Sequence, residues 1–109
     1  MTIDFNKMEA TIIPNFKGGE KEISAKMFFD GNNRIMKGVL QPGASIGYHS
    51  HDTSSEIIFI IKGKGKVIDN NETVTIEEGQ CHYCKKGDSH SLINDSDKEL
   101  VFYAAVPQQ

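Results

Sequence analysis

The chain has 109 residues, which is long enough for one domain whose hydrophobic core needs no disulfides. Its formal net charge is −3. Arg34 is the only arginine and no basic stripe surrounds it, so nucleic-acid binding is not expected. No segment approaches the roughly 20 apolar residues of a membrane helix, and the N-terminus lacks the basic-then-apolar pattern of a secretory signal, so a cytoplasmic protein without membrane contact is predicted.

Short segments rich in Val, Ile, Phe and Tyr alternate with turn-forming residues along the chain. Near the N-terminus, residues 5–10 are the segment least unsuited to a helix, and that helix would be short. Beyond it, turn-forming clusters lie at residues 18–19, 30–33, 41–43, 52–55, 62–65, 69–72, 78–79, 85–88 and 94–98. Turns at intervals of about 8–12 residues around short strands are typical of an all-β sandwich or barrel.

Two predicted strands, residues 57–61 and 100–106, are apolar without the alternation of a strand that has one face in water. Both faces of each strand are therefore predicted to be covered. The cover would come from the N-terminal segment, residues 1–33, or from a second subunit, because an uncovered apolar sheet face would be an exposed patch. A homodimer is predicted. The alternative is a thicker sandwich within one chain.

The spacing of His49 and His51 indicates a strand. Residues i and i+2 point to the same face of a strand but lie far apart around a helix axis, so the two imidazoles can reach one ion only from an extended segment. The turn formers of residues 52–55 follow, and Glu56 opens the next apolar run. A hairpin would place Glu56 beside the two histidines, and His90 would arrive from a third strand.

The side chains of His49, His51, Glu56 and His90 form a ligand set for one divalent transition metal ion. Mixed imidazole and carboxylate ligands suit Fe(II), Mn(II), Ni(II), Co(II) or Zn(II), and the residue types do not choose among these ions. Four protein ligands leave positions open in an octahedral shell. Open positions are typical of a site that binds or transforms a small molecule rather than of a structural site.

Two stretches of the sequence resemble the two motifs of the cupin family. The first motif is matched at every position, by Gly43, His49, His51, Glu56 and Gly63. The second is matched by Gly79, Gly87, His90 and Asn94, with Lys85 where the family has proline. The motifs span residues 43–94, about half of the chain. The chain is thus similar to small, single-domain cupins.

The resemblance implies a jelly-roll, double-stranded β-helix barrel, formed by residues 1–109 as one domain, with a single metal ion in the barrel mouth. In related small cupins, the positions of His82 and Cys84 hold residues that face the barrel interior. The resemblance therefore implies that His82 and Cys84 line the pocket near the metal. There His82 would be either a catalytic proton shuttle or a hydrogen-bonded interior histidine without a chemical role.

Arg34 and the cysteines complete the candidate site residues. The Arg34 guanidinium could bind a substrate carboxylate through two hydrogen bonds, or it could be a solvated strand residue. Cys81 and Cys84 would point to opposite faces of a strand, and no second cysteine pair exists, so a zinc or redox site at this pair is not favoured.

Two functions are consistent with these residues. One is a small metalloenzyme, such as a dioxygenase, decarboxylase, isomerase or lyase, acting on a substrate that chelates through oxygen: a carboxylate, keto acid or enediol. The alternative is a non-catalytic protein that binds a small carboxylate through its metal. A protic group placed for acid–base chemistry in the pocket would distinguish them, and His82 is the candidate.

Overall fold

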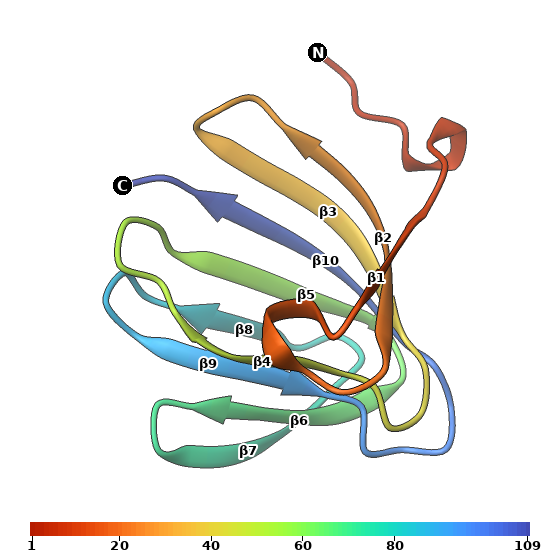
Figure 1. Cartoon of the computed structure of the whole chain (residues 1–109), viewed down its shortest axis with the longest axis vertical. Helices are drawn as coiled ribbons and strands as arrows, with labels where there is room; N and C mark the ends of the chain where they lie inside the picture. The colour runs from red at the N-terminus through yellow and green to blue at the C-terminus, as the bar shows by residue number, and fades with distance from the viewer.

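Ten β-strands form the fold of residues 1–109 in the computed structural model (Figure 1). The strands are β1 (Thr11–Pro14), β2 (Glu22–Phe29), β3 (Asn33–Leu40), β4 (Ser45–Ser50), β5 (Glu56–Lys62), β6 (Lys64–Asp69), β7 (Glu72–Glu77), β8 (Cys81–Cys84), β9 (Ser89–Ile93) and β10 (Leu100–Pro107). Two short 3₁₀ helices, η1 (Phe5–Lys7) and η2 (Phe16–Gly18), flank β1. The predicted all-β class is confirmed.

The strands pair in two antiparallel sheets. One sheet has six strands in the order β1-β2-β3-β10-β5-β8, and the other has four in the order β4-β9-β6-β7. Figure 1 shows the C-terminal strand β10 lying between β3 and β5. From β3 onward the chain passes from one sheet to the other at most connections, which is the jelly-roll arrangement. The predicted double-stranded β-helix fold is therefore confirmed.

The hydrophobic core lies between the two sheets. Alternate residues of β3, β5 and β10 point inward, and Leu40, Ile58 and Phe102 are almost completely buried. The four-stranded sheet contributes Val67 and Leu92 from the opposite side. Complete burial of each such side chain stabilises the fold by roughly 1.5–3 kcal/mol, so the two sheets are held face to face and the mouth between them is fixed.

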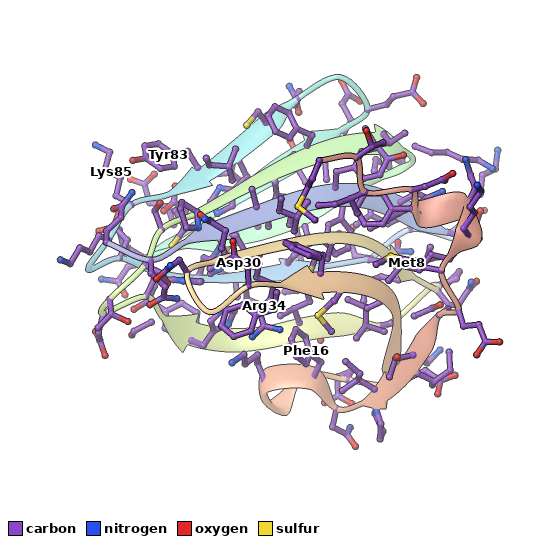
Figure 2. All side chains as sticks on the ribbon, turned by 90° about the horizontal axis from the view of Figure 1, so that it is seen from above. Met8, Phe16, Asp30, Arg34, Tyr83 and Lys85 are labelled. Atoms are coloured by element: carbon purple, nitrogen blue, oxygen red, sulfur yellow. The ribbon has the colours of Figure 1, made fainter.

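The outer face of the six-stranded sheet differs from the prediction for residues 57–61. Within one chain β5 alternates: Ile58 and Ile60 are buried, whereas Phe59 is 49% and Ile61 43% exposed. The apolar run is thus fully buried on its inner side only. The neighbouring strand β8 adds Tyr83, which protrudes at this edge in Figure 2.

The N-terminal segment covers part of the same face. The short helix predicted near residues 5–10 is the single turn η1, capped by the Asp4 side chain, which accepts a hydrogen bond from the Asn6 amide at 2.9 Å. The Phe5 ring stacks on Tyr103 of β10 with centroids 5.6 Å apart, and Lys26 donates to the Phe5 carbonyl at 3.0 Å. No helix of the structure is long and apolar enough to cross a membrane.

Candidate metal centre

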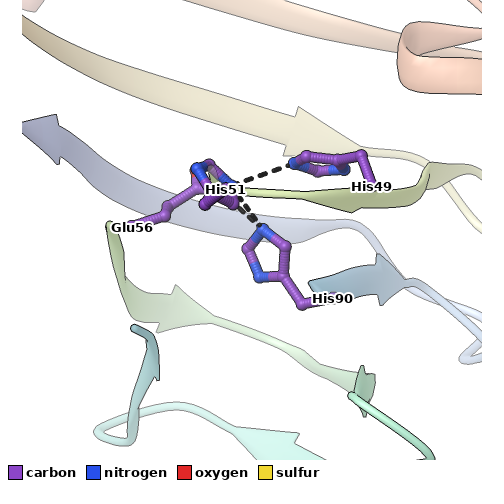
Figure 3. A group of neighbouring side chains, drawn as sticks. All are labelled: His49, His51, Glu56 and His90. Carbon is purple, nitrogen blue, oxygen red and sulfur yellow. Dashed lines mark hydrogen bonds and ion pairs between the residues drawn. The ribbon is translucent and has the colours of Figure 1, made fainter. Parts of the chain in front are cut away.

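The four predicted ligands meet at one end of the space between the sheets (Figure 3). His49 lies on β4, His51 directly after it, His90 on β9, and Glu56 opens β5. One ligand atom from each side chain can be chosen so that all four lie within 4.8 Å of one another. His51, Glu56 and His90 are buried, and His49 is half-buried. The sequence motifs thus correspond to one cluster in space.

Strand pairing positions the three histidines. His49 and His90 are direct cross-strand partners of β4 and β9. His51 lies two residues after His49, and its backbone continues the pairing, since its N–H donates to the Asp88 carbonyl at 3.0 Å. His49 and His51 therefore project to the same side, as the spacing indicated. Tyr48, directly before His49, points outward, and its hydroxyl donates to the Asn70 carbonyl at 2.9 Å.

Glu56 does not reach the site through the predicted hairpin, and that prediction is wrong. Strand β4 pairs with β9 in the four-stranded sheet, whereas β5 pairs with β10 and β8 in the six-stranded sheet. Residues 52–55 form the crossing between the sheets rather than a tight turn, because β4 and β5 have no backbone pairing with each other. Glu56 thus faces the histidines from the opposite sheet, and the site ties the two sheets together.

The donor atoms converge on one point. The Nε2 atoms of His49 and His51 are 3.1 Å apart, and those of His51 and His90 are 3.0 Å apart. The Glu56 Oε1 atom lies 2.9 Å from His90 Nε2 and 3.3 Å from His51 Nε2. Each residue therefore offers one ligand atom to a shared centre, with the other ring nitrogens turned away.

Each outward-facing ring nitrogen has its own partner. The Nδ1 atom of His49 lies 2.7 Å from the Gly47 carbonyl, and that of His51 lies 2.8 Å from the Ser54 hydroxyl. The Nδ1 atom of His90 lies 3.0 Å from Nε2 of a fourth histidine, His82. Such partners orient imidazole ligands and select the tautomer that presents a lone pair to a metal.

These hydrogen bonds test whether the cluster fits a metal ion. A carbonyl only accepts, so His49 must donate from Nδ1, and its Nε2 then carries a lone pair. This lone pair lies 3.1 Å from His51 Nε2, in the cluster that also contains His90 and the Glu56 carboxylate. His51 and His90 lie within hydrogen-bond distance of Glu56 and can donate to it from Nε2 without a metal, and a divalent cation would replace these protons and take all four donor atoms together. The donor set therefore fits one transition metal ion.

Burial and charge shift two pKa values in the direction that favours metal binding. Burial by itself raises the pKa of Glu56, but hydrogen bonds from His51 and His90 outweigh it and hold the pKa at about 2. Burial is also the main reason that the pKa of His49 is lowered from 6.5. The carboxylate is thus charged and the imidazole neutral at neutral pH, as metal ligands must be.

A cavity of about 500 Å³ opens beside the cluster. It is lined by His49, His51 and Glu56 and also by Arg34 from β3, whose guanidinium lies 4.6 Å above the Phe29 ring. Arg34 makes no ion pair with an acidic side chain of the chain. The structure thus places the predicted arginine in the same cavity as the candidate ligands, with its charge available to a bound anion.

The cavity has residues that the sequence reasoning missed. Phe16 and Lys17 belong to η2 and line the cavity on the side of Arg34; Figure 2 shows Phe16 and Arg34 close together. Helix η2 reaches β4 because Gly47 has no side chain: a Cβ atom there would overlap the Lys17 carbonyl. Gly18 and Gly19 after Lys17 indicated a turn in the sequence, but they did not indicate that this segment packs against β4.

His82 and Cys84 do not line this cavity. His82 lies behind His90 and borders a second cavity, of about 470 Å³, together with Asp69 and Gln80. Its pKa is lowered, mainly by burial. Cys84 is completely buried, and burial raises the pKa of its thiol to about 12. Cys81 is exposed and both thiols are free, so they form no disulfide.

Comparison with known proteins agrees with this geometry. The family model of the cupin domain matches residues 36–106. The oxalate-binding protein of Thermotoga maritima is 30% identical in an alignment of 112 positions that covers 97% of this chain and 93% of that protein. A crystal structure from Thermotoga maritima, described as a predicted oxalate decarboxylase, has a TM-score of 0.93 at 28% identity and covers 100% of both chains.

A more distant solved structure shows the fold alone. It is an uncharacterised Klebsiella pneumoniae protein with a double-stranded β-helix domain, with a TM-score of 0.76 at 15% identity, covering 97% of this chain and 88% of that one. The fold, the two sequence motifs and the family match agree with one another. The chain belongs to the cupin family.

Proposed function

We propose that the protein binds one divalent transition metal ion through His49, His51, Glu56 and His90 and uses it to hold a small dicarboxylate such as oxalate. The observation that carries this proposal is the convergence of three Nε2 atoms and one carboxylate oxygen, with the Nδ1 atoms already engaged elsewhere. Fe(II), Mn(II), Ni(II), Co(II) and Zn(II) all suit this donor set.

The cavity supports an anionic ligand that chelates through oxygen. When bound, the metal would act as a Lewis acid that takes carboxylate oxygens at its open positions. Arg34 and Lys17 add two positive charges to the cavity wall, and a guanidinium matches the two oxygens of a carboxylate. A similar chain, the Thermotoga maritima relative, is named as an oxalate-binding protein, which supports oxalate as the first ligand to test.

Turnover of the bound carboxylate is the second candidate function. A similar crystal structure is described as a predicted oxalate decarboxylase, and four protein ligands leave room for a reacting group. The cavity itself, however, contains neither His82, the candidate protic group, nor Cys84, which was expected to line the pocket. The arrangement of residues therefore favours binding as the primary function, with His82 kept as the predicted catalytic residue of the alternative.

Calorimetric titration with oxalate tests the proposal. Metal-free protein is prepared with a chelator and reloaded with Mn(II), Co(II) or Zn(II), and oxalate is titrated into both forms. We expect binding to the metal-loaded form only, and butyrate, which carries one carboxylate, should bind more weakly than oxalate. Equal oxalate binding with and without metal would contradict the proposal. Assays for carbon dioxide and formate in the same samples would detect turnover.

We further propose that two copies of the chain associate through the outer face of the six-stranded sheet. Ile57, Phe59 and Ile61 of β5 and Tyr83 of β8 form the patch, which we call the outer apolar patch. A second copy would cover these side chains and complete the burial that the sequence indicates. In this arrangement residues 1–109 form one cupin domain, and residues 1–33 pack on the sheet and beside the partner.

The expected setting is the cytoplasm. Both cysteines are free thiols, although Cys81 is exposed, and free thiols are usual in a reducing compartment. Location of a tagged chain by cell fractionation would test this prediction, and recovery from an oxidising compartment would contradict it.

A further inference from the structure

The three candidate imidazole ligands are oriented alike, but the hydrogen-bond partner of Nδ1 differs from one to the next. Each turns Nε2 toward the centre and Nδ1 toward a group behind it. For His49 that group is a backbone carbonyl and for His51 a hydroxyl, whereas for His90 it is the imidazole of His82. A carbonyl fixes the direction of a hydrogen bond. An imidazole does not, because either ring can donate.

Metal binding would remove this freedom. If Nε2 of His90 binds the metal, its only remaining site for a proton is Nδ1, which must then donate. Its one partner is Nε2 of His82 at 3.0 Å, so this nitrogen must accept. The proton of a neutral His82 consequently sits on Nδ1. The direction of the His90–His82 hydrogen bond is thus set by the metal.

The surroundings of His82 suit this tautomer. His82 lies on β8 opposite Ile58 of β5 and points inward, and its ring is buried. Its Nδ1 makes no hydrogen bond within the chain, yet no buried side-chain polar atom lacks a partner. Nδ1 therefore reaches solvent, and His82 borders the second cavity. A proton on Nδ1 can be hydrated there at little cost, while Nε2 stays free to accept from His90.

We propose that His82 is a positioning residue of the metal centre, which accepts the hydrogen bond from His90 and holds that ligand in the tautomer that presents Nε2. The inference rests on the proposed metal binding through His90. It assigns His82 a role that requires neither contact with the ligand in the first cavity nor proton transfer. Partners of this kind change metal affinity by about 10- to 100-fold.

The tautomers can be read directly. In Zn(II)-loaded protein labelled with ¹⁵N-histidine, long-range ¹H–¹⁵N correlation spectra should show His82 protonated on Nδ1 and unprotonated on Nε2. His49 is the internal reference, because its Nδ1 donates to a carbonyl and must be protonated. His82 protonated on Nε2 in the zinc-loaded state would overturn this inference alone. Wild-type protein that binds no Zn(II) would overturn both this inference and the proposed function.

Variants provide a second test that needs no activity. In His82→Leu the acceptor is lost, and Zn(II) affinity measured by chelator competition should fall about 10- to 100-fold. His82→Gln keeps an oxygen acceptor and should recover most of the affinity. Thr73→Leu, exposed on β7 and outside both cavities and the outer apolar patch, is the control and should match wild type. Equal affinities of the folded Leu and Gln variants would overturn the inference, and if His82→Leu does not fold, the tautomer measurement decides.

Discussion

Strand β5 borders two unusual regions. In one a charged side chain is buried, and in the other apolar side chains are exposed. Inside the sandwich, its first residue, Glu56, is buried with three imidazoles. On the outer side of the same strand, Phe59 and Ile61 are half exposed although they are apolar. Charged groups are seldom buried without partners, and large apolar patches are seldom left in water.

The two regions differ in how far the chain itself provides the missing contacts. Inside, every buried polar side-chain atom has a partner, and the ring nitrogens are already oriented. The cluster is prearranged and could hold one metal ion. Outside, Phe5 from the N-terminal segment stacks on Tyr103, whereas Phe59 and Ile61 of β5 stay about half exposed. We expect a second copy of the chain to cover the outer apolar patch.

Removing ligands should have the largest effect on this comparison. In the variant His49→Ala with His51→Ala, two of four donors are lost, so metal affinity should fall by more than the roughly 100-fold seen for outer-shell partners. Elemental analysis after dialysis measures the loss. Tyr48→Phe, directly before His49 but facing outward, is the matched control and should retain the metal. A double variant that binds metal like wild type would remove the basis of the site.

Charging the outer apolar patch should abolish association. Wild type should have twice the chain mass of 12.1 kDa in size-exclusion chromatography with light scattering, and Phe59→Lys should have the chain mass. The side chain is half exposed in the chain, so the fold should tolerate lysine. Val74→Lys on β7, 48% exposed on the other sheet, is the control and should stay dimeric. A monomeric wild type would contradict the proposed dimer.

Removing the cavity arginine should weaken oxalate binding while leaving the metal in place. A hydrogen bond to a charged group contributes about 1.5–3 kcal/mol, so Arg34→Gln should lower oxalate affinity roughly 10- to 100-fold. Lys37→Gln, on the same strand but the opposite face, controls for the loss of one positive charge. If both variants bind oxalate equally well, Arg34 does not contact the ligand.

Lowering the pH should produce the smallest of these effects, a loss of stability in the metal-free protein. The pKa values of His49 and His82 are lowered from 6.5, mainly by burial, so the unfolded chain binds more protons than the folded chain below that pH. The free energy of unfolding of metal-free protein should therefore decrease as the pH falls below about 6.5. Glu56, with its pKa at about 2, adds a further loss below 4.5.

Urea unfolding with a chelator at pH 7.5 and 5.5 would measure this change. The His82→Gln variant should lose less stability between the two pH values than wild type, because it lacks one of the two histidines whose pKa is lowered. Stability that rises on acidification would show that the sign of the histidine shifts is wrong.

The ligand residues and the fold class could be predicted because both depend on short-range patterns. The i, i+2 spacing of His49 and His51 fixes a common face once the segment is extended. Turn-forming clusters between β-branched runs indicate strands. The direct pairing of His49 with His90 could not be derived, since it depends on which strands become neighbours in the sheet.

The predictions that failed concern contacts between the two sheets, which closeness in sequence does not determine. Glu56 follows the histidines closely in sequence, which suggested a hairpin, but the chain changes sheet between them. The resemblance to small cupins implied that His82 faces inward, as it does, yet it could not indicate that His90 would lie between His82 and the cavity. Lys17 was missed because its place at the cavity depends on the contact of η2 with Gly47.

An anomalous difference map from a crystal grown with Mn(II), Co(II) or Zn(II) would test the central claim most directly. The account predicts one peak per chain, about 2.0–2.2 Å from the Nε2 atoms of His49, His51 and His90 and from a Glu56 oxygen. Elemental analysis of the same sample should give one metal ion per chain. A map with no peak among these four side chains, from protein that is folded and saturated with metal, would contradict the account.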